Sequence, residues 1–214
     1  MKRCVWKILV ICLCCIAQGV GAQTGKIYTT DMGLSSSLIN QIFQDKQGFV
    51  WVATEYGLNK FDGLRFTNYR HVSADSSSIK NNYVRTLFED SRCNLLIGCI
   101  DGLMKYDRET DTFLEIPMFR AGKRVFPHIT QMQELHNGEI WMTTTGQGMF
   151  RLDERQTQAV SVDDLLKQSN YNFQSFFYED SYYNIWIGTY GNGLLCYMPA
   201  TKEAVSYTHL TLPT

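Results

Sequence analysis

The sequence is poor in cysteine, and most of its cysteines lie near the N-terminus. Of the seven cysteines, only Cys93, Cys99 and Cys196 lie beyond residue 15. An odd, small number of cysteines excludes a disulfide framework as the basis of the fold, and the separation of the first two is not a zinc-ligand spacing. We expect Cys99 and Cys196 to behave as small buried hydrophobic residues.

An excess of charge and an abundance of proline are also missing. The net charge is −1, from 20 basic and 21 acidic residues. A chain without a basic excess lacks the electrostatic footprint for binding phosphate backbones, so the composition argues against a nucleic-acid partner. With 4 prolines and 44% hydrophobic residues, the chain is typical of a globular protein and unlike a low-complexity polymer.

The N-terminus has the pattern of an export signal. Basic residues among the first seven positions precede an apolar run from Ile8 to Ala17, and small residues follow at 20–22. This pattern predicts a signal peptide over residues 1–22. The apolar run is short for a membrane span, although a retained anchor is the alternative.

Four segments of the chain repeat with a constant period. Their anchor positions are Trp51, Leu96, Trp141 and Trp186, and each lies 45 residues after the one before. Three of the four tryptophans of the chain share this column. A period of this length is typical of propeller arrays. The units cover approximately residues 34–70, 79–116, 126–160 and 171–204.

Each unit predicts strands and tight turns. In the first unit, β-favouring residues surround Trp51, and Asp45 and Gly48 frame a turn that the carboxylate caps and the glycine closes with a positive φ. A second turn ends at Gly57, and two more strands follow. Four antiparallel strands in about 45 residues make one propeller blade. We therefore predict an all-β fold, an incomplete β-propeller of about four four-stranded blades over residues 23–204.

The repeated residues are expected to hold blades together. A single four-stranded sheet cannot bury both of its faces, so the tryptophan column should pack between neighbours. The carboxylates Asp45, Asp90 and Asp180 recur at one position of the repeat. Symmetry should therefore spread them around the ring, whereas glycoside hydrolysis needs a converging pair.

No other residues form a recognisable catalytic or metal-binding pattern. His71, His128 and His136 have no metal-ligand spacing, and no nucleophile motif is present. The sequence thus predicts no catalytic residue, no metal ligand, no cofactor and no enzymatic activity for this fragment. The ligand-contacting residues cannot be assigned from the sequence.

Some residues outside the repeated motif are candidates for recognition. Tyr56, Tyr182 and Tyr190 lie in or near turns, where they could stack on sugar rings, although we favour packing against the next blade. The segments between units, such as 71–82 and 120–124, are polar or basic and are either recognition loops or plain linkers.

The last residues depart from the repeat. Residues 205–214 ignore the pattern and resemble translated adapter sequence, so we expect a non-native tail after Ala204. Four units are visible, and closed propellers have about four to eight. We expect the native ring to include further blades.

The motifs resemble a known family. The run from Ile42 to Gly63 resembles the first unit of the two-component regulator propeller repeat, and the run from Trp186 to Leu194 resembles a later unit. The similarity covers about residues 27–204. It implies the N-terminal periplasmic sensor region of a Bacteroidetes hybrid two-component system histidine kinase, in which two propellers of about seven blades precede a membrane span and the kinase.

The resemblance also implies partners and a location. These are an oligosaccharide ligand, the remainder of the sensor chain with its second propeller, and a homodimer formed through regions outside this chain. The parent protein would be anchored in the inner membrane, and its catalytic domains would lie beyond these blades. The alternatives are a secreted propeller that acts as a protein-interaction scaffold and, less favoured, a propeller lyase or glycosidase.

Overall fold

The computed structural model describes residues 25–166, 174–189, 191 and 193–207. The expected signal peptide, Tyr190 and residues 208–214 of the expected tail lie outside this range. Within it, no helix has both the length and the apolar character needed to cross a bilayer.

Almost all regular structure is β-strand, and the strands fall into four consecutive groups. A short 3₁₀ helix, Thr30–Met32, precedes them. The groups are β1 (Ile39–Gln44), β2 (Val50–Thr54), β3 (Gly57–Phe61) and β4 (Phe66–Tyr69); β5 (Val84–Glu89), β6 (Leu95–Cys99), β7 (Gly102–Asp107) and β8 (Thr112–Ile116); β11 (His128–Glu134), β12 (Ile140–Thr145), β13 (Met149–Leu152) and β14 (Ala159–Ser161); and β15 (Gln174–Glu179), β16 (Ile185–Thr189), β17 (Leu194–Met198) and β18 (Glu203–Tyr207).

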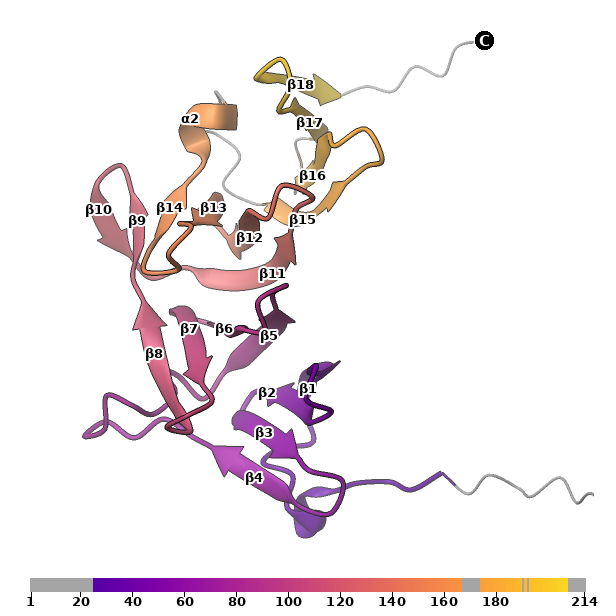
Figure 1. The fold of residues 1–214 in the computed structure, drawn as a ribbon, viewed down its shortest axis with the longest axis vertical. Helices are drawn as coiled ribbons and strands as arrows, with labels where there is room; N and C mark the ends of the chain where they lie inside the picture. The colour runs from indigo at the N-terminus through magenta and orange to yellow at the C-terminus, as the bar shows by residue number, and fades with distance from the viewer. Residues whose placement is uncertain (1–24, 167–173, 190, 192, 208–214) are drawn as a thin grey trace, which may run out of the picture.

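Each group is a meander in which sequential strands pair antiparallel. The groups follow one another along an arc, with the first strands, β1, β5, β11 and β15, toward its concave side (Figure 1). These groups are the predicted blades, which we number one to four in chain order. The arc is open, so the prediction of an incomplete propeller is confirmed.

The hydrophobic core lies between blades, as the repeat predicts. Three clusters of buried side chains fill the junctions of blades one and two, two and three, and three and four. In the anchor column, Trp51, Leu96 and Trp141 are at most 2% exposed. Stacking the sheets therefore removes from water the faces that one blade cannot cover alone.

The first blade has an uncovered face. Ile42 is 63% exposed, whereas the residues at the same repeat position in blades two to four, Leu87, Met132 and Phe177, are at most 7% exposed. Those three pack against the preceding blade. No described segment occupies the equivalent place beside Ile42, which is the geometry expected at an end of an open arc.

One inter-blade segment differs from the linker that the sequence suggested. β9 (Met118–Arg120) and β10 (Lys123–Val125) form a hairpin, and β9 pairs parallel with β14. The third sheet consequently has six strands. The turn between the two strands uses a positive φ at Ala121 and Gly122, so the basic segment is a structured edge and not a plain linker.

The outer strand of the fourth blade passes the boundary expected for the foreign tail. Residues 205–207 belong to β18 and pair with β17 from Leu194 to Cys196. Backbone hydrogen bonds accept almost any side chain on an outermost strand. The origin of these residues therefore stays a prediction.

Candidate functional site

The repeated aspartate ties its turn to the tryptophan column. Asp45 Oδ1 accepts hydrogen bonds from two backbone amides of its own turn. Its Oδ2 accepts the indole N–H of Trp51 at 2.8 Å, and Asp180 receives Trp186 in the same way, also at 2.8 Å. The predicted capping role of this aspartate is confirmed. Each of these carboxylates is engaged by groups of its own blade.

In the second blade, leucine takes the place of tryptophan, and the aspartate has other partners. Asp90 accepts a hydrogen bond from the side chain of Asn94 at 2.8 Å and another from Gln156, which reaches over from the third blade. Asp90 is 1% exposed, and these hydrogen bonds satisfy its buried carboxylate without an indole. The substitution to Leu96 is structurally compensated.

The third blade shows the reverse change, with Leu135 in place of the aspartate. The indole N–H of Trp141 donates to Glu139 at 3.0 Å instead. Arg151 pairs with the same glutamate at 2.6 Å. A carboxylate from a different position thus satisfies the buried indole N–H of this blade.

A second repeated carboxylate links consecutive blades. Glutamates end the first strand of blades two, three and four, and each accepts a backbone N–H from the turn of the preceding blade. The pairs are Lys46 with Glu89 at 2.8 Å, Ser91 with Glu134 at 2.7 Å and His136 with Glu179 at 2.8 Å. This column was visible in the sequence at the period of 45 residues, although we assigned it no role.

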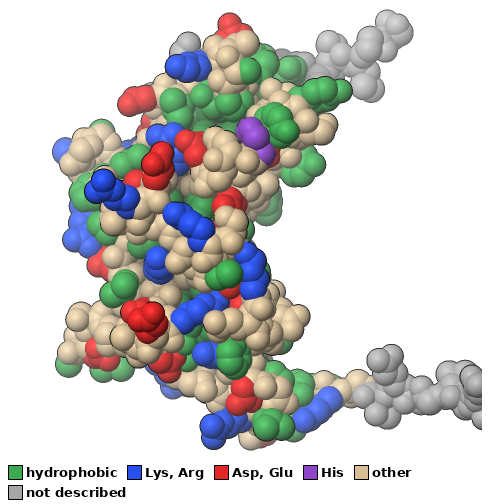
Figure 2. Space-filling view, viewed as in Figure 1, with side chains coloured by type: hydrophobic (Ala, Val, Ile, Leu, Met, Phe, Trp, Pro, Cys, Tyr) green, Lys and Arg blue, Asp and Glu red, His purple; other side chains and the backbone are tan. Residues whose placement is uncertain are grey.

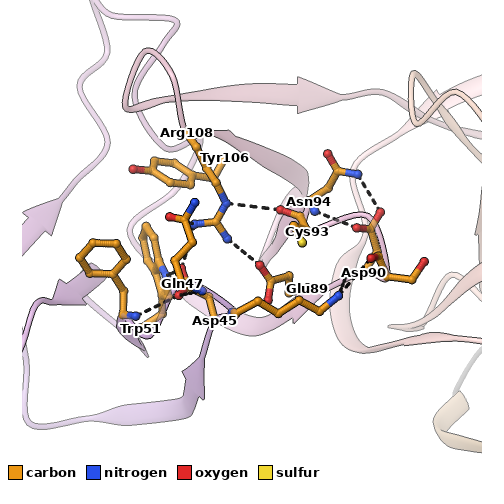
Figure 3. A network of polar contacts seen from close by, with 12 residues as sticks. Asp45, Gln47, Trp51, Glu89, Asp90, Cys93, Asn94, Tyr106 and Arg108 are labelled. Atoms are coloured by element: carbon orange, nitrogen blue, oxygen red, sulfur yellow. Dashed lines mark hydrogen bonds and ion pairs between the residues drawn. The ribbon is translucent and has the colours of Figure 1, made fainter.

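Arg108 connects the two kinds of carboxylate at the first junction. Its guanidinium donates to Asp45 at 2.9 Å, to Glu89 at 2.7 Å and to Gln47 at 3.1 Å (Figure 3). It also donates to the backbone oxygen of Cys93 at 3.3 Å. The side chains of Asp45 and Glu89 are 0% and 2% exposed. One cation therefore neutralises two buried anions between blades one and two.

These contacts predict acid sensitivity. Burial opposes the charge on Asp45, but hydrogen bonds from Trp51 and Arg108 outweigh it and hold the pKa of this carboxyl below its ordinary value. A carboxyl with a lowered pKa contributes stability that is present above its unfolded pKa, about 3.9, and is lost as the pH falls through its folded pKa. We expect the free energy of unfolding to fall steeply below about pH 4.

Urea unfolding at pH 7 and pH 3 would measure this loss. In Asp45→Asn, a smaller part of the stability should depend on acid, because the variant has one fewer carboxylate to protonate. Asp31→Asn, at an exposed aspartate outside the blades, should keep the native acid dependence. Equal stability of the native protein at the two pH values would contradict the assignment.

The innermost strands share a bulge that lies at the same repeat position in every blade. The pairing register skips one residue between Ile39 and Gln41, and again at the equivalent places in β5, β11 and β15. The extra residues with described side chains are Asn40, Arg85 and Thr130. Bulges re-aim side chains and are frequent beside functional sites.

Side chains at the bulges cross from blade to blade. Asn40 Nδ2 donates to the backbone oxygen of Val84 at 2.8 Å, and Asn40 Oδ1 accepts from Arg85 at 3.3 Å. The neighbouring Gln41 bonds both the N–H and the C=O of Leu87, at 2.7 and 3.1 Å. The side-chain amide of Gln41 therefore pairs with the backbone of Leu87 as a neighbouring strand would, and so links blade one to blade two. At this junction the concave edge is polar, and side-chain hydrogen bonds connect the two blades.

A histidine lies where the innermost strand of the third blade begins. His128 occupies the repeat position of Tyr83, and the two rings meet edge to face at 5.8 Å. Its Nε2 atom is buried and has no hydrogen-bond partner among the described residues. Burial, together with the charge of Arg85, lowers the pKa of His128. The ring is therefore neutral at pH 7.

The candidate aromatic residues do not converge. Tyr56 is 60% exposed although the next blade is present, so the packing that we favoured for it is wrong. Tyr182 is 83% exposed, but no following blade is described that could cover it. Tyr56 lies between the second and third strands and Tyr182 between the first and second. Successive turns of a meander lie at opposite ends of the strands. The rings of Tyr56 and Tyr182 therefore lie at opposite ends of their blades.

A polar hollow of about 610 Å³ opens on the third blade. It lies between the β11–β12 and β13–β14 turns, and Arg92 of the second blade closes one side. Its charged lining carries both signs: Arg92, Arg151, Arg155, Glu139, Asp153 and Glu154. The face shown in Figure 2 likewise mixes basic and acidic side chains. Such a hollow suits a hydroxylated ligand better than an apolar one.

Two of the three described cysteines are buried in the blades. Cys99 and Cys196 are buried as predicted, and burial raises the pKa of the Cys99 thiol to about 12. In the part of the chain that the structure describes, no three His, Cys, Asp or Glu side chains are grouped so that they could hold a metal ion. Cys93 adopts a positive φ of 66° where Gly48 stands in the first blade, so a cysteine substitutes for the turn glycine.

Comparison with known sequences connects the first blade to a family. Residues 33–56 match the two component regulator propeller family. A stretch of 54 residues is 52% identical to Histidine kinase P4 of Formosa agariphila, and covers 25% of this chain and 4% of that protein. The relative is therefore a much longer chain.

Comparison with solved structures covers most of the chain. The extracellular domain of a hybrid two-component system from Bacteroides thetaiotaomicron is 25% identical with a TM-score of 0.74, over 86% of this chain and 26% of that one. A second such extracellular domain from the same organism is 22% identical with a TM-score of 0.67, over 79% of this chain and 25% of that one. The chain spans about a quarter of these domains. The first blade thus matches the two component regulator propeller family, and the fold of the chain is similar to that of these extracellular domains.

Proposed function

We propose that this chain is the N-terminal part of an extracytoplasmic sensor domain that binds carbohydrate and, within a longer protein, controls a histidine kinase. The observation that carries the sensory part is the similarity over 86% of the chain to an extracellular domain of a hybrid two-component system. The similarity to a protein named as a histidine kinase supports the proposal that the sensor controls a kinase. We propose the periplasm as its location, which the similarity to extracellular domains supports and which agrees with the signal peptide predicted from the sequence.

The carbohydrate part rests on the surface chemistry. The hollow on the third blade is lined by charged and amide side chains, including Arg155 and Asn137. Beside it in the same turn, His136 stacks on Tyr183, with ring centroids 3.7 Å apart, and Tyr183 is 52% exposed. Planar rings next to hydrogen-bonding groups are the combination that sugar rings require.

Calorimetric titration of oligosaccharides into the complete sensor region of the parent protein tests the proposal. We expect saturable binding of at least one glycan class. Tyr183→Ala and Arg155→Ala would show whether the hollow takes part, and Arg65→Ala, an exposed arginine of the first blade, is the matched control. The absence of binding to neutral, acidic and sulfated glycans alike would overturn the carbohydrate assignment.

Catalysis is not part of the proposal. The repeated carboxylates Asp45, Asp90 and Asp180 are each engaged by a side chain of their own blade, and the hollow contains Glu139 already bonded to Trp141 and Arg151. We propose that the enzymatic step of the parent protein belongs to its kinase domain. No observation specifically favours the lyase, glycosidase or scaffold alternatives.

A further inference from the structure

The concave edge carries one charge that nothing in the described structure neutralises. Arg85 is exposed on the innermost strand of the second blade. Its one hydrogen bond among the described residues goes to the neutral amide of Asn40, and no described carboxylate lies within ion-pair distance. By contrast, Arg108, at the first junction, is engaged by two carboxylates. An arginine without an acidic partner keeps its full capacity to bind an anion.

The position of Arg85 is built by the backbone. It is the extra residue of a bulge, and the same bulge places Asn40 and Thr130 at the equivalent positions of the neighbouring blades. Asn40 has both of its amide atoms engaged, and Thr130 bonds Thr143 at 2.9 Å. Among the described side chains of this row, Arg85 is therefore the charged member, and the other two are neutral and engaged in hydrogen bonds. The repeat requires the bulge, but it does not require an arginine there.

A second group without a hydrogen-bond partner among the described residues lies on the adjoining strand, β11. The buried Nε2 atom of His128 has no partner in the described part of the chain. β5 and β11 pack together, and Arg85 is close enough for its charge to lower the pKa of His128. A buried polar atom without a partner is uncommon and calls for a ligand or water that satisfies it. An arginine and a histidine with unused N–H capacity therefore lie on the adjoining inner strands of two blades.

We propose that Arg85 and His128 bind an oxyanion, the carboxylate or sulfate group of an acidic sugar, at the concave edge between blades two and three. The guanidinium offers paired N–H donors that match a carboxylate or sulfate. The imidazole supplies one further N–H donor through Nε2, and its ring is already held against Tyr83. This inference rests on the proposed function and narrows its ligand from carbohydrate in general to acidic carbohydrate.

The test uses the complete sensor region and defined probes. D-glucuronate, sodium sulfate, sodium phosphate and neutral D-glucose are titrated by calorimetry at constant ionic strength, and the same probes are scored by the melting temperature. We expect glucuronate or sulfate, and not glucose, to bind and to raise the melting temperature. In Arg85→Gln the affinity should be about 10- to 100-fold lower, because one charge-assisted contact is lost. Arg65→Gln, at an exposed arginine of the first blade that lies in neither proposed site, should leave binding at this edge unchanged.

The outcomes separate this inference from the proposed function. Binding of neutral glycans with no response to glucuronate, sulfate or phosphate overturns the oxyanion site and leaves a carbohydrate sensor. Binding of sulfate or phosphate that depends on Arg85, without any binding of sugars, supports the site and overturns the carbohydrate assignment. Anion binding that Arg85→Gln and His128→Gln both leave unchanged also overturns the proposal, because the anion then lies elsewhere.

Discussion

Replacing Trp51 with alanine should lower the free energy of unfolding of the complete sensor region by about 3–5 kcal/mol. The indole is 0% exposed. It meets Tyr106 of the next blade edge to face at 4.9 Å and stacks on Tyr69 at 5.9 Å. The substitution therefore leaves a cavity in the core between blades one and two, and it removes the indole N–H that donates to Asp45.

Urea unfolding followed by circular dichroism would measure this loss, because the substitution removes one of the tryptophans and would change the fluorescence signal itself. Trp51→Phe is the matched variant. It keeps an aromatic ring in the junction and removes the N–H, so it should cost about 1–3 kcal/mol. A loss below about 1 kcal/mol in Trp51→Ala would contradict the account, because burial in an inter-blade core predicts a large effect.

Replacing Arg108 with alanine should lower the free energy of unfolding by about 3–5 kcal/mol, since it removes the counter-ion of buried charges. The side chains of Asp45 and Glu89, which are 0% and 2% exposed, would both lose this partner. The uncompensated anions are costly in a medium of low polarity. Part of this loss should return at low pH, where protonation removes the unpaired charge.

The control for Arg108 is an exposed pair. Arg65 contacts Asp62 at 3.6 Å, and its side chain is 85% exposed. Arg65→Ala should cause no measurable loss, because solvent screens such pairs. Adding Glu89→Gln to Arg108→Ala should recover part of the stability, since one unpaired charge disappears. Equal losses for Arg65→Ala and Arg108→Ala would show that Arg108 does not neutralise buried charge.

The blades could be predicted because the residues that form them recur at a constant spacing in the sequence. The period of 45 residues, the column from Trp51 to Trp186 and the turn pair Asp45 and Gly48 each follow from physics that acts within a single blade or between identical neighbours. The structure places them as expected. The substitutions at Leu96 and Leu135 were visible as drift, but the side chains that compensate for them were not.

The residues that could not be predicted from the sequence each act at a single junction between blades. Arg108 and Gln156 each bridge one junction, so no periodic signal marks them. The hairpin of β9 and β10 also has no counterpart in the other blades, which is why its sequence resembled a linker. Glu89, Glu134 and Glu179 are different, because their spacing of 45 residues was available and would have indicated a contact between blades.

The candidate site was the least predictable part. Asn40, Arg85 and Thr130 share a bulge but no chemistry, and a bulge is invisible until strands are paired. The free Nε2 atom of His128 is likewise a property of packing. The sequence identifies positions that hold the blades together, whereas the candidate binding residues lie where the repeat tolerates variation.

The central claim is that the repeated residues hold the blades together and that the acidic group of the ligand is bound by variable residues of the concave edge. Calorimetric titration of one acidic glycan ligand into Trp51→Phe and Arg85→Gln tests it most directly, with the melting temperature recorded for both. The account predicts native affinity at a lowered melting temperature for Trp51→Phe, and affinity lowered about 10- to 100-fold at a native melting temperature for Arg85→Gln. Unchanged affinity in Arg85→Gln would contradict it.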